Sequence, residues 1–557
     1  MVFRYLIRGL RNFSRSFKQR RIRWVYFDLV NSLPERPEPP KSFVMRRIFP
    51  PQKLTIAYFR EMMNRIARVK NIKGVIIHLR DEQEGNARRQ SIRKILHDLK
   101  AKGKKIIVYA HEYSFLDYYI ASVADEIFIQ PGGQCFVVGL ELTRIFFKDI
   151  LAKNEIQFEA LPISPYKSAM DMFTRSSISD EDQEQYQAIL DSYFAVIVDA
   201  LMNKLGKSQE KIQEIIDNAP YTALQAKKLG LVTDVVNNEE LELHVKKIAH
   251  TKRGQIYAWQ QADRMITLGK LEPRRNKIAI ISINGTIIDG ESQSFPFRIP
   301  IPIFGDEQAG DHTIVNQIRH AIADNSIKAV VLEINSPGGS GAASEAIRAA
   351  TIELTKTKPL VAYFNDIAAS GGYYIATAAN KVIAQPTTLT GSIGVLAGKF
   401  VLDKGLEKQG INTHYLRVGE NAGILSSEKA FSTQERKKLR AMITEFYDLF
   451  VDHVSELIGK DREEFEEYCR GRVWSGKDAY ELGLVDDLGD LETAIKQAAE
   501  LANLKEGKYQ VVDIFKAENI PPSYLQTKNT KISLNSLLES YMKTKIWLLM
   551  PEHIEIR

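Results

Sequence analysis

The chain has 557 residues, of which 44% are apolar and 26% are charged, the composition of a folded globular protein. This length is too great for one ordinary domain, and the formal net charge of +7 is modest for the size. The only two cysteines, Cys135 and Cys469, exclude a disulfide framework and a cysteine-based zinc site, so both are expected to be buried as small apolar residues.

Residues 1–52 are predicted to be a basic amphipathic segment followed by a spacer. Residues 1–23 contain eight Lys or Arg and no acidic residue, and Pro34 to Pro40 is rich in proline. On a helix, four apolar side chains would share one face and four arginines would lie nearly opposite: Leu6, Leu10, Phe13 and Phe17 against Arg4, Arg8, Arg11 and Arg15. This pattern favours an interfacial helix on an anionic membrane, with a solvated basic arm or a helix packed on a partner as alternatives.

The chain is therefore expected to bind the membrane surface without crossing the membrane. The sequence contains no run of about 18 apolar residues, so a transmembrane helix is not predicted. Arginines interrupt each apolar run before Trp24, which argues against a secretory signal. Nucleic-acid binding is not expected, because the rest of the chain has no comparable basic stripe. The side of the membrane stays open.

An internal repeat organises the rest of the chain. The segment Tyr118 to Pro131 matches Tyr373 to Pro386 at an offset of 255 residues, with seven of fourteen positions identical. The same offset aligns the apolar runs that begin at Ile72 and Ile327. Self-similarity of this kind indicates a tandem duplication.

Each copy is predicted to be an α/β domain. Short apolar runs such as AVVLEI at Ala329 and PLVAYF at Pro359 alternate with longer segments of helical period. The first copy is placed at residues 53–255 and the second at residues 277–505, joined by a linker at 256–276. The tail, residues 506–557, contains apolar clusters that suggest packing on the core or on another subunit, and no chemistry is assigned to it.

The second copy carries two segments suited to catalysis. A predicted strand leads into N-S-P-G-G-S, from Asn335 to Ser340, whose glycines expose backbone N–H groups that can bind an oxyanion. The next strand leads into A-A-S-G-G-Y-Y, which places Ser370 at the start of a helix with little steric cover. The first copy has Phe115 at the position of Ser370, and R-D-E-Q-E-G, residues 80–85, in place of the glycine turn.

A nucleophilic serine needs a general base. The G-x-S-x-G elbow is absent, and none of the ten histidines lies in a recognisable motif, so His111 is interpreted as structural. These observations leave a lysine or a carboxylate as the base.

The motifs together resemble signal peptide peptidase A in its long, duplicated form. The resemblance covers most of residues 53–505 and rests on four segments: S-P-G-G-S, A-A-S-G-G-Y-Y, T-G-S-I-G at 390–394 and Y-K-S-A at 166–169. It implies the fold of the Clp protease and crotonase superfamily, that is, a tandem duplication of a Clp protease/crotonase-like domain. It also implies a Ser/Lys dyad divided between the repeats, no cofactor or metal, hydrophobic peptide substrates such as cleaved signal peptides, and a homo-oligomer, with a tetramer favoured.

The site residues implied by the resemblance are five. Ser370 is the nucleophile and Lys167 the general base, while Ser392 orients the lysine and the N–H groups of Gly339 and Gly371 form the oxyanion hole. The repeats are complementary here, because Lys167 aligns with Ala422 at the 255-residue offset just as Ser370 aligns with Phe115. Long relatives commonly carry a transmembrane segment near the N-terminus, which this sequence lacks.

The base must be neutral to accept a proton. Burial in an apolar site would lower the pKa of Lys167, and closure of one domain against another is the expected source of that burial. A distance above about 6 Å between Lys167 Nζ and Ser370 Oγ would count against direct proton transfer.

Three alternatives remain. The chain could be a catalytically inactive membrane-associated scaffold, a crotonase-like acyl-CoA enzyme that needs neither residue, or a peptidase whose base is Lys429. The sequence leaves open whether Lys167 and Ser370 meet within one chain or between neighbouring chains.

Overall fold

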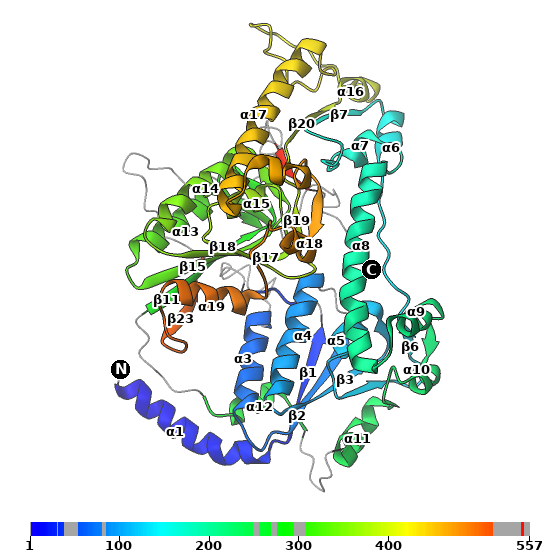
Figure 1. Ribbon diagram of the computed structural model, residues 1–557, viewed down its shortest axis with the longest axis vertical. Helices are drawn as coiled ribbons and strands as arrows, with labels where there is room; N and C mark the ends of the chain where they lie inside the picture. Colours follow the sequence, from blue (N-terminus) through cyan, green and yellow to red (C-terminus); the bar gives the residue numbers. More distant parts are fainter. Residues whose placement is uncertain are drawn as a thin grey trace. The chain divides into compact units, whose positions relative to one another are not determined.

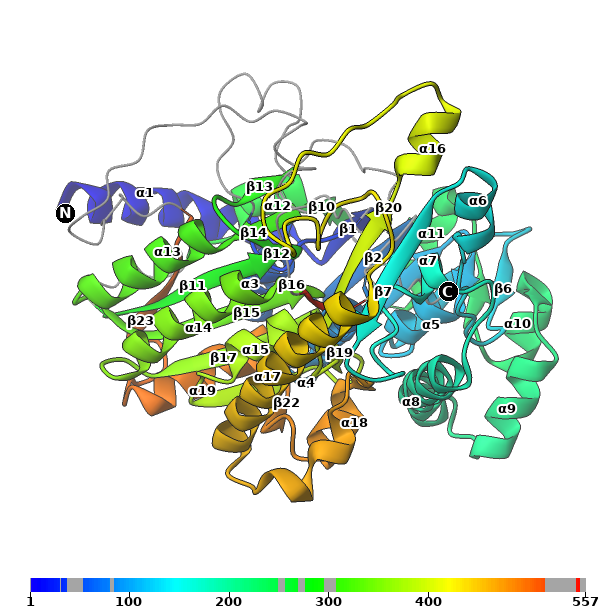
Figure 2. The ribbon, with the colours of Figure 1, turned by 90° about the horizontal axis from the view of Figure 1, so that it is seen from above.

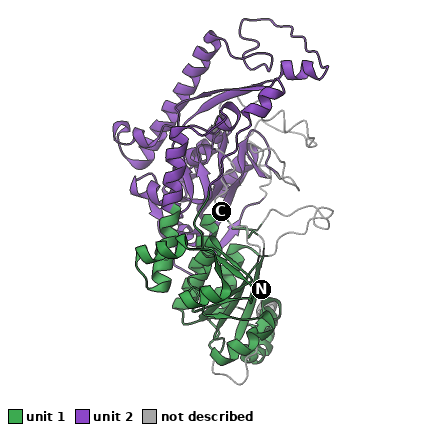
Figure 3. Ribbon diagram, turned by 90° about the vertical axis from the view of Figure 1, so that its right-hand side faces the viewer, with its two compact units in different colours: residues 1–141, 193–273, 557 green, residues 142–192, 274–556 purple. Residues whose placement is uncertain are grey.

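The computed structural model describes residues 2–30, 32–37, 54–80, 85–248, 256–268, 276–294, 307–515 and 547–550. The chain forms two compact units (Figure 3). Unit 1 contains residues 1–141 and 193–273, and unit 2 contains residues 142–192 and 274–556. The segment 142–192, which belongs to the first sequence repeat, is therefore part of the same compact unit as the second repeat.

Unit 1 is built on a six-stranded parallel sheet of order β10-β1-β2-β3-β5-β9 (Figure 1). Strands such as GVIIHLR and KIIVYA are almost wholly apolar because both faces of the sheet are covered. Two clusters of apolar side chains pack on its opposite faces. The strands are β1 (Trp24–Val30), β2 (Gly74–Arg80), β3 (Lys105–Ala110), β5 (Glu126–Ile129), β9 (Asp234–Val235) and β10 (Ile256–Ala258).

Unit 1 also contains helices and a second, three-stranded sheet of order β4-β6-β8. The helices are α3 (Ile56–Ala67), α4 (Asn86–Ala101), α5 (Phe115–Ala121), α9 (Gln209–Asp217), α10 (Ala223–Leu229), α11 (Leu241–Ile248) and α12 (Trp259–Met265). The small strands are β4 (Tyr113–Ser114), β6 (Gln134–Phe136) and β8 (Tyr221–Thr222). The segment 256–276, expected as a linker, thus contributes β10 and α12 to unit 1, since its apolar residues Trp259 and Ala262 are buried in the core.

Unit 2 contains an eight-stranded sheet whose main path is β21-β19-β17-β15-β11-β23, with β18 paired to β17 and β22 paired to β18. Helices α13, α14 and α17 cover one face and α19 covers the other (Figures 1 and 2). The strands are β11 (Asn276–Asn284), β15 (Ile327–Ser336), β17 (Leu360–Ala369), β18 (Lys381–Ala384), β19 (Leu389–Gly391), β21 (Val473–Ser475), β22 (Asp487–Leu488) and β23 (Tyr509–Asp513). The helices are α13 (Asp311–Ala323), α14 (Gly341–Thr355), α15 (Gly371–Ala376), α16 (Asp403–Lys408), α17 (Thr433–Ile458), α18 (Gly476–Glu481) and α19 (Leu491–Leu501).

A seven-stranded sheet, of order β13-β14-β12-β16-β24-β20-β7, completes unit 2. It joins segments that are far apart in the chain, from β7 in the first repeat to β24 near the C-terminus. Its strands are β7 (Gln157–Pro162), β12 (Thr286–Ile288), β13 (Gln293–Ser294), β14 (Glu307–Gly310), β16 (Gly338–Ser340), β20 (Leu396–Val401) and β24 (Trp547–Leu549). Helices α6 (Lys148–Lys153) and α7 (Asp171–Thr174) flank β7 in sequence, and α8 (Asp180–Leu205) follows them.

The predicted α/β fold class and tandem duplication are confirmed. The elements of the two copies recur at the offsets found in the sequence: β3 and β17 begin 255 residues apart, as do β5 and β18, while α8 and α17 begin 253 residues apart. Of the two tail clusters, IWLLM contributes β24, and LNSLLESYM at 534–542 lies outside the described residues.

The predicted N-terminal helix is α1 (Val2–Lys18), and its polar face is bound to unit 1. The side-chain amide of Asn12 donates to the Leu268 carbonyl at 2.9 Å, and the Arg15 guanidinium donates to the carbonyls of Asp263 and Ile266. The apolar stripe faces outward, with Leu10 73% and Phe13 68% exposed. Among the described residues, no helix combines the length and apolar character needed to cross a bilayer.

Candidate active site

Ser370 stands at the junction of β17 and α15 in a strained backbone conformation. Its φ is +54° and its ψ −113°, a region that residues other than glycine rarely adopt. The Ser370 N–H donates to the Gly391 carbonyl at 2.9 Å, and its carbonyl accepts from the Tyr374 N–H at 2.8 Å. These two hydrogen bonds hold the strained turn in place. They therefore fix the position of the backbone from which the Ser370 hydroxyl projects.

The glycines after Ser370 are required by close packing against the P-G-G turn. A Cβ on Gly371 would lie 2.7 Å from Ser344 Oγ and 3.2 Å from the backbone nitrogen of Gly339. A Cβ on Gly339 would lie 2.0 Å from the Ile287 carbonyl oxygen. The structure therefore brings Gly339 and Gly371, both predicted to donate to an oxyanion, next to each other and next to Ser370.

Lys167 follows β7 and reaches Ser370 within unit 2. Its Nζ lies 2.6 Å from Ser370 Oγ, 2.8 Å from the Ser392 carbonyl oxygen and 2.9 Å from Ser392 Oγ. Lys167 is 2% exposed and Ser370 is 0% exposed. The 2.6 Å separation is well inside the 6 Å limit set from the sequence, and the two residues belong to one chain.

Burial lowers the pKa of Lys167 well below its ordinary value of 10.5. Desolvation is the cause, because an ammonium loses its hydration in an enclosed site, whereas the three oxygens around Nζ carry no formal negative charge. The expected source of the burial was closure of one domain against another. That expectation is wrong, since the segment 142–192 is folded into unit 2 and the burial arises inside that unit.

Ser392 is positioned by a second strained turn. Its φ is +50°, its N–H donates to the Arg472 carbonyl at 2.7 Å, and the preceding Gly391 is at the end of β19 with φ +75°. The hydroxyl and the carbonyl of Ser392 both accept from Lys167, as the T-G-S-I-G motif suggested for the hydroxyl alone. Two acceptors on one residue fix the direction of the amine.

One residue that sequence reasoning missed, Gly471, packs against the backbone of Lys167. A Cβ on Gly471 would lie 2.7 Å from the Cβ and 2.9 Å from the Cα of Lys167, and a Cβ on Gly394 would lie 2.8 Å from the Gly471 Cα. The Gly471 N–H donates to the Ile393 carbonyl at 2.7 Å. Gly471 thus links the lysine loop to the Ser392 turn. The segment C-R-G-R at 469–472 resembles no catalytic motif, so nothing in the sequence indicated this role.

A buried polar network anchors the residue after Lys167. Ser168 donates to the Asp182 carboxylate, which also accepts from the Arg144 guanidinium at 2.9 Å. The Gln185 amide donates to Ser168 at 3.1 Å and accepts from the Val473 N–H at 3.2 Å. Asp182 is 0% exposed, so its charge depends on Arg144 for compensation.

The other residues considered from the sequence lie elsewhere. Lys429, the alternative base, is exposed, and His111 is exposed in unit 1. Phe115, the counterpart of Ser370, is a buried core residue. It is the first residue of α5 and follows the N-cap residue Ser114. Residues 81–84 of the R-D-E-Q-E-G segment lie outside the described residues. Both cysteines are buried as predicted, and burial raises the pKa of each thiol to about 12.

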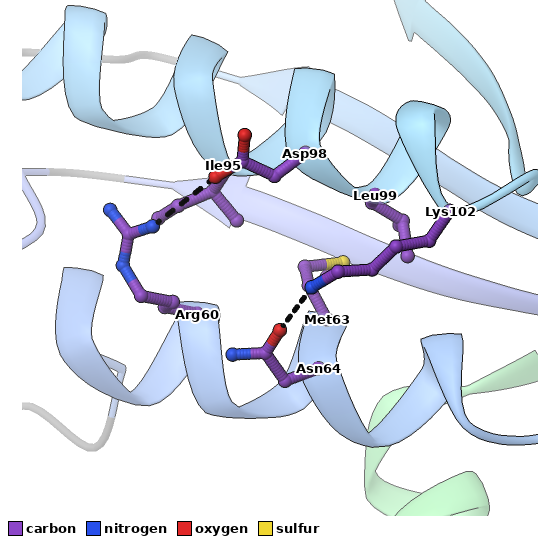
Figure 4. A pocket seen from close by; sticks show the side chains of 7 residues that line it. All are labelled: Arg60, Met63, Asn64, Ile95, Asp98, Leu99 and Lys102. Carbon is purple, nitrogen blue, oxygen red and sulfur yellow. Dashed lines mark hydrogen bonds and ion pairs between the residues drawn. The ribbon is translucent and has the colours of Figure 1, made fainter. Parts of the chain in front are cut away.

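A hollow between α3 and α4 is too small to be a binding site. It has a volume of about 10 Å³ and is lined by apolar and charged side chains of the two helices, with Lys102 bonded to Asn64 and Arg60 paired with Asp98 (Figure 4). This volume holds about one water molecule. Among the described residues, no group of three or more His, Cys, Asp or Glu side chains is arranged to bind a metal.

Comparisons with known proteins show that the chain is similar to serine proteases. The family model described as peptidase family S49 matches residues 98–252 and 352–505. A chloroplastic serine protease SPPA of Arabidopsis thaliana is 31% identical over 82% of this chain and 67% of its own length. Protease 4 of Haemophilus influenzae is 32% identical over 73% of this chain and 66% of its own length, and Protease 4 of Salmonella typhi is 31% identical over 80% and 72%.

The α/β repeats, the buried serine and these relatives define a serine-type peptidase. The chain belongs to peptidase family S49, whose model matches it once in each repeat. The resemblance drawn from the four sequence motifs is thereby confirmed. The matched regions span about two thirds of the length of these relatives.

Proposed function

We propose that this chain is a serine endopeptidase in which Ser370 is the nucleophile and Lys167 the general base. The observation that carries the proposal is the 2.6 Å contact between Lys167 Nζ and Ser370 Oγ, two side chains that are buried in unit 2. The lowered pKa of the buried Lys167 amine favours its neutral form, which can accept a proton, whereas an exposed lysine is protonated at neutral pH.

The first half of the reaction forms an acyl-enzyme. Lys167 takes the hydroxyl proton of Ser370 as Oγ attacks the carbonyl carbon of the scissile peptide bond. The resulting oxyanion is stabilised by the backbone N–H groups of Gly339 and Gly371, which need no reorganisation because the turn is rigid. The lysine ammonium then protonates the leaving amine, the C–N bond breaks, and Lys167 returns to its neutral form.

The second half reverses these roles with water. Lys167 removes a proton from a water molecule, the hydroxide attacks the acyl carbonyl, and the ammonium returns the proton to Ser370 Oγ as the ester bond breaks. Ser392 stabilises the ammonium in both halves through its hydroxyl and carbonyl oxygens. One lysine therefore serves as base and acid, and no cofactor enters any step.

The proposed substrates are hydrophobic peptides released at a membrane, such as cleaved signal peptides. An apolar cluster of unit 2 supports this choice, because it includes Met170, three residues after Lys167, and Leu396, four residues after Ser392. A homo-oligomer, with a tetramer favoured, stays a prediction.

We further propose that α1 places the enzyme on the membrane surface without crossing it. Four apolar side chains on its outward face are exposed: Ile7, Leu10, Phe13 and Phe17. Exposed cationic residues flank this stripe, Arg11 and Lys18 on one margin and Arg20 on the other. An apolar stripe bordered by cations matches the boundary between acyl chains and anionic headgroups.

Two measurements test the dyad. Ser370→Ala and Lys167→Met should each reduce cleavage of a quenched fluorescent hydrophobic peptide at least about 1000-fold. Lys429→Met is the matched control, because Lys429 is an exposed lysine of the same unit, and it should keep native activity. A fluorophosphonate should label the native chain at Ser370 and fail to label Ser370→Ala. Retained turnover in either dyad variant, or loss of turnover in Lys429→Met, would contradict the assignment.

A further inference from the structure

The start of helix α8 is held in place by Ser179 (Figure 1). Ser179 Oγ accepts from the Asp182 N–H at 3.2 Å, and the Ser179 carbonyl accepts from the Gln183 N–H at 2.9 Å. Both bonds satisfy N–H groups of the first helical turn, which have no partner inside the helix. The side chains of Asp182 and Gln185 are three residues apart on this fixed support, so they lie on the same face of the helix.

The side-chain amide of Gln185 is buried and held in one orientation. Gln185 is 1% exposed. Its Nε2 donates to Asp182 Oδ1 at 2.9 Å and to Ser168 Oγ at 3.1 Å, and its Oε1 accepts from the Val473 N–H at 3.2 Å. The Asp182 carboxylate, which is paired with Arg144, can only accept, and a backbone N–H can only donate. The oxygen and the nitrogen of this amide therefore cannot exchange places.

The nitrogen of this amide contacts the chain on both sides of Lys167. Ser168 follows the lysine, and the carbonyl oxygen of Tyr166, which precedes it, lies 3.5 Å from Gln185 Nε2. Ser168 also donates to the Asp182 carboxylate, so the lysine loop is bonded to two residues of α8. The backbone from which the lysine side chain projects is therefore tied to the start of this helix.

The oxygen of the same amide holds the strand that lies next to the Ser392 turn. Val473 is the first residue of β21, which pairs with β19, the strand that leads to Ser392. The Arg472 carbonyl accepts from the Ser392 N–H at 2.7 Å. Ser392 in turn accepts from the Lys167 amine through its hydroxyl and its carbonyl. These contacts form a closed ring that runs from Lys167 through Gln185 and β21 to Ser392 and back to Lys167.

A second link between the two segments lies at the surface. Glu184 accepts from the Tyr166 hydroxyl at 2.8 Å and is paired with Arg472 at 2.7 Å. The Glu184 side chain is 53% exposed, and ion pairs at such sites contribute little because water and salt screen them. The buried amide of Gln185 is therefore the stronger link between the lysine loop and the Ser392 turn.

We infer that Gln185 is a positioning residue of the dyad, whose amide sets the distance between the Lys167 loop and the Ser392 turn and so directs the lysine amine at Ser370. The inference rests on the proposed function, because it takes Lys167 as the general base. Gln185 acts through its neighbours, so its loss should impair proton transfer and leave peptide binding unchanged.

The first test replaces Gln185 by methionine, which keeps the length of the side chain and removes the amide. We expect kcat for a quenched hydrophobic peptide to fall at least about 30-fold, with KM changed less than about twofold. The amine then moves away from its acceptors on Ser392, which disfavours the ammonium, so the midpoint of the rise of kcat with pH should move to lower pH. Gln187→Met is the matched control. Gln187 is an exposed glutamine of the same helix that donates to Asp191 at 2.8 Å, and its replacement should leave kcat and the midpoint unchanged.

Ser168→Ala breaks the same link at its lysine end and keeps the Gln185 bonds to Asp182 and Val473, so it tests the inference even if Gln185→Met does not fold. It should reduce kcat about tenfold and also move the midpoint to lower pH. Because both substitutions break one link, the double variant should lose at least about threefold less kcat than the product of the two single losses. An unmoved midpoint in both single variants would overturn the inference, since a merely structural amide changes the amount of folded enzyme and not the titration of its base.

The outcome for the dyad variants separates this inference from the peptidase assignment. If Ser370→Ala and Lys167→Met are inactive while Gln185→Met keeps native kcat and midpoint, the dyad stands and the role of Gln185 fails. If the native chain cleaves no peptide, the proposed function fails, and a crystal structure of Gln185→Met still tests the positioning. The separation between Lys167 Nζ and Ser392 Oγ should then grow from 2.9 Å to more than about 3.5 Å. An unchanged separation would overturn the inference.

Discussion

Gly471 lies so close to Lys167 that no side chain fits between them. A Cβ at position 471 would lie 2.7 Å from the Lys167 Cβ and 2.9 Å from its backbone nitrogen, and atoms that are not bonded to each other do not approach so closely. The atoms in the way belong to the start of the side chain and to the backbone, which cannot turn aside. The position of the lysine amine therefore depends on a glycine about 300 residues further along the chain.

Replacement of Gly471 by alanine should displace Lys167 and disable the enzyme while the fold is kept. A shift of about 1 Å in a catalytic group can reduce the rate about 100-fold, so we expect kcat to fall at least 100-fold with little change in KM. Steady-state kinetics on a hydrophobic peptide, with circular dichroism as a check on folding, measure this.

The matched control is Gly459→Ala at the end of α17. Both glycines have positive φ, +85° for Gly471 and +65° for Gly459, so both substitutions carry the same kind of backbone strain. No atom lies within 4 Å of a Cβ built on Gly459. Gly459→Ala should lose about 1 kcal/mol of stability and keep its activity. If Gly471→Ala retained native kcat, the close contact would not position the lysine.

The lowered pKa of Lys167 predicts a specific dependence of stability on pH. Burial lowers the pKa of the amine in the folded chain well below 10.5, whereas in the unfolded chain the amine keeps its ordinary pKa of 10.5. The unfolded state therefore binds one more proton than the folded state between these two pKa values, and the native free energy of unfolding rises with pH there. Lys167→Met removes this contribution. The free energy of unfolding of the variant, relative to native, should fall by about 1.4 kcal/mol for each pH unit gained in that window.

Urea unfolding of both chains at pH 7.5, 8.5 and 9.5 measures this difference. Lys429→Met replaces an exposed lysine and should follow the native curve at each pH. A constant difference between Lys167→Met and native across the three pH values would show that the buried amine is charged in the folded state, which would exclude it as a base at neutral pH.

Much of the fold and the nucleophile could be predicted from the sequence because they depend on local patterns. The apolar runs of β15 and β17, the glycines after Ser370 and the repeat offset are all short-range signals. Lys167 was found through the Y-K-S-A motif, although its environment was misjudged: burial was expected from closure between domains, whereas it comes from the packing of residues 142–192 into unit 2.

The contacts that complete the site could not be predicted because they join distant segments. Gly471 contacts Lys167 through a glycine whose neighbours form no catalytic pattern. The tail strand β24 is three residues long, and its apolar run is compatible with many partners. Pairing of such a short strand is decided by the two open edges of β16 and β20, which only the assembled sheet provides.

Ser392 should act by orienting and stabilising the lysine ammonium. Ser392→Ala removes the hydroxyl 2.9 Å from Nζ and keeps the carbonyl at 2.8 Å, so we expect kcat to fall about tenfold with KM unchanged. Loss of one acceptor disfavours the protonated amine, so the midpoint of the rise of kcat with pH should move to lower pH. Ser455→Ala, which removes a hydroxyl bonded to the Lys460 carbonyl on the surface, is the control and should leave the midpoint in place. If kcat fell but the midpoint of its rise with pH did not move, Ser392 would have only a structural role.

The outward face of α1 should bind anionic membranes. Leu10→Asp/Phe13→Asp places two carboxylates on the apolar stripe, where Leu10 and Phe13 are 73% and 68% exposed and make no contribution to the core. Burial of each side chain in a bilayer contributes about 1.5–3 kcal/mol, so the double variant should bind vesicles at least ten times more weakly.

The control is Leu224→Asp/Leu243→Asp, which changes two other exposed leucines of unit 1, 67% and 57% exposed, on α10 and α11. Cosedimentation with vesicles of phosphatidylcholine and phosphatidylglycerol, compared with phosphatidylcholine alone, measures binding, and added salt should weaken it because the flanking Arg and Lys residues act through charge. If Leu10→Asp/Phe13→Asp bound as tightly as the control, the apolar stripe of α1 would have a different partner.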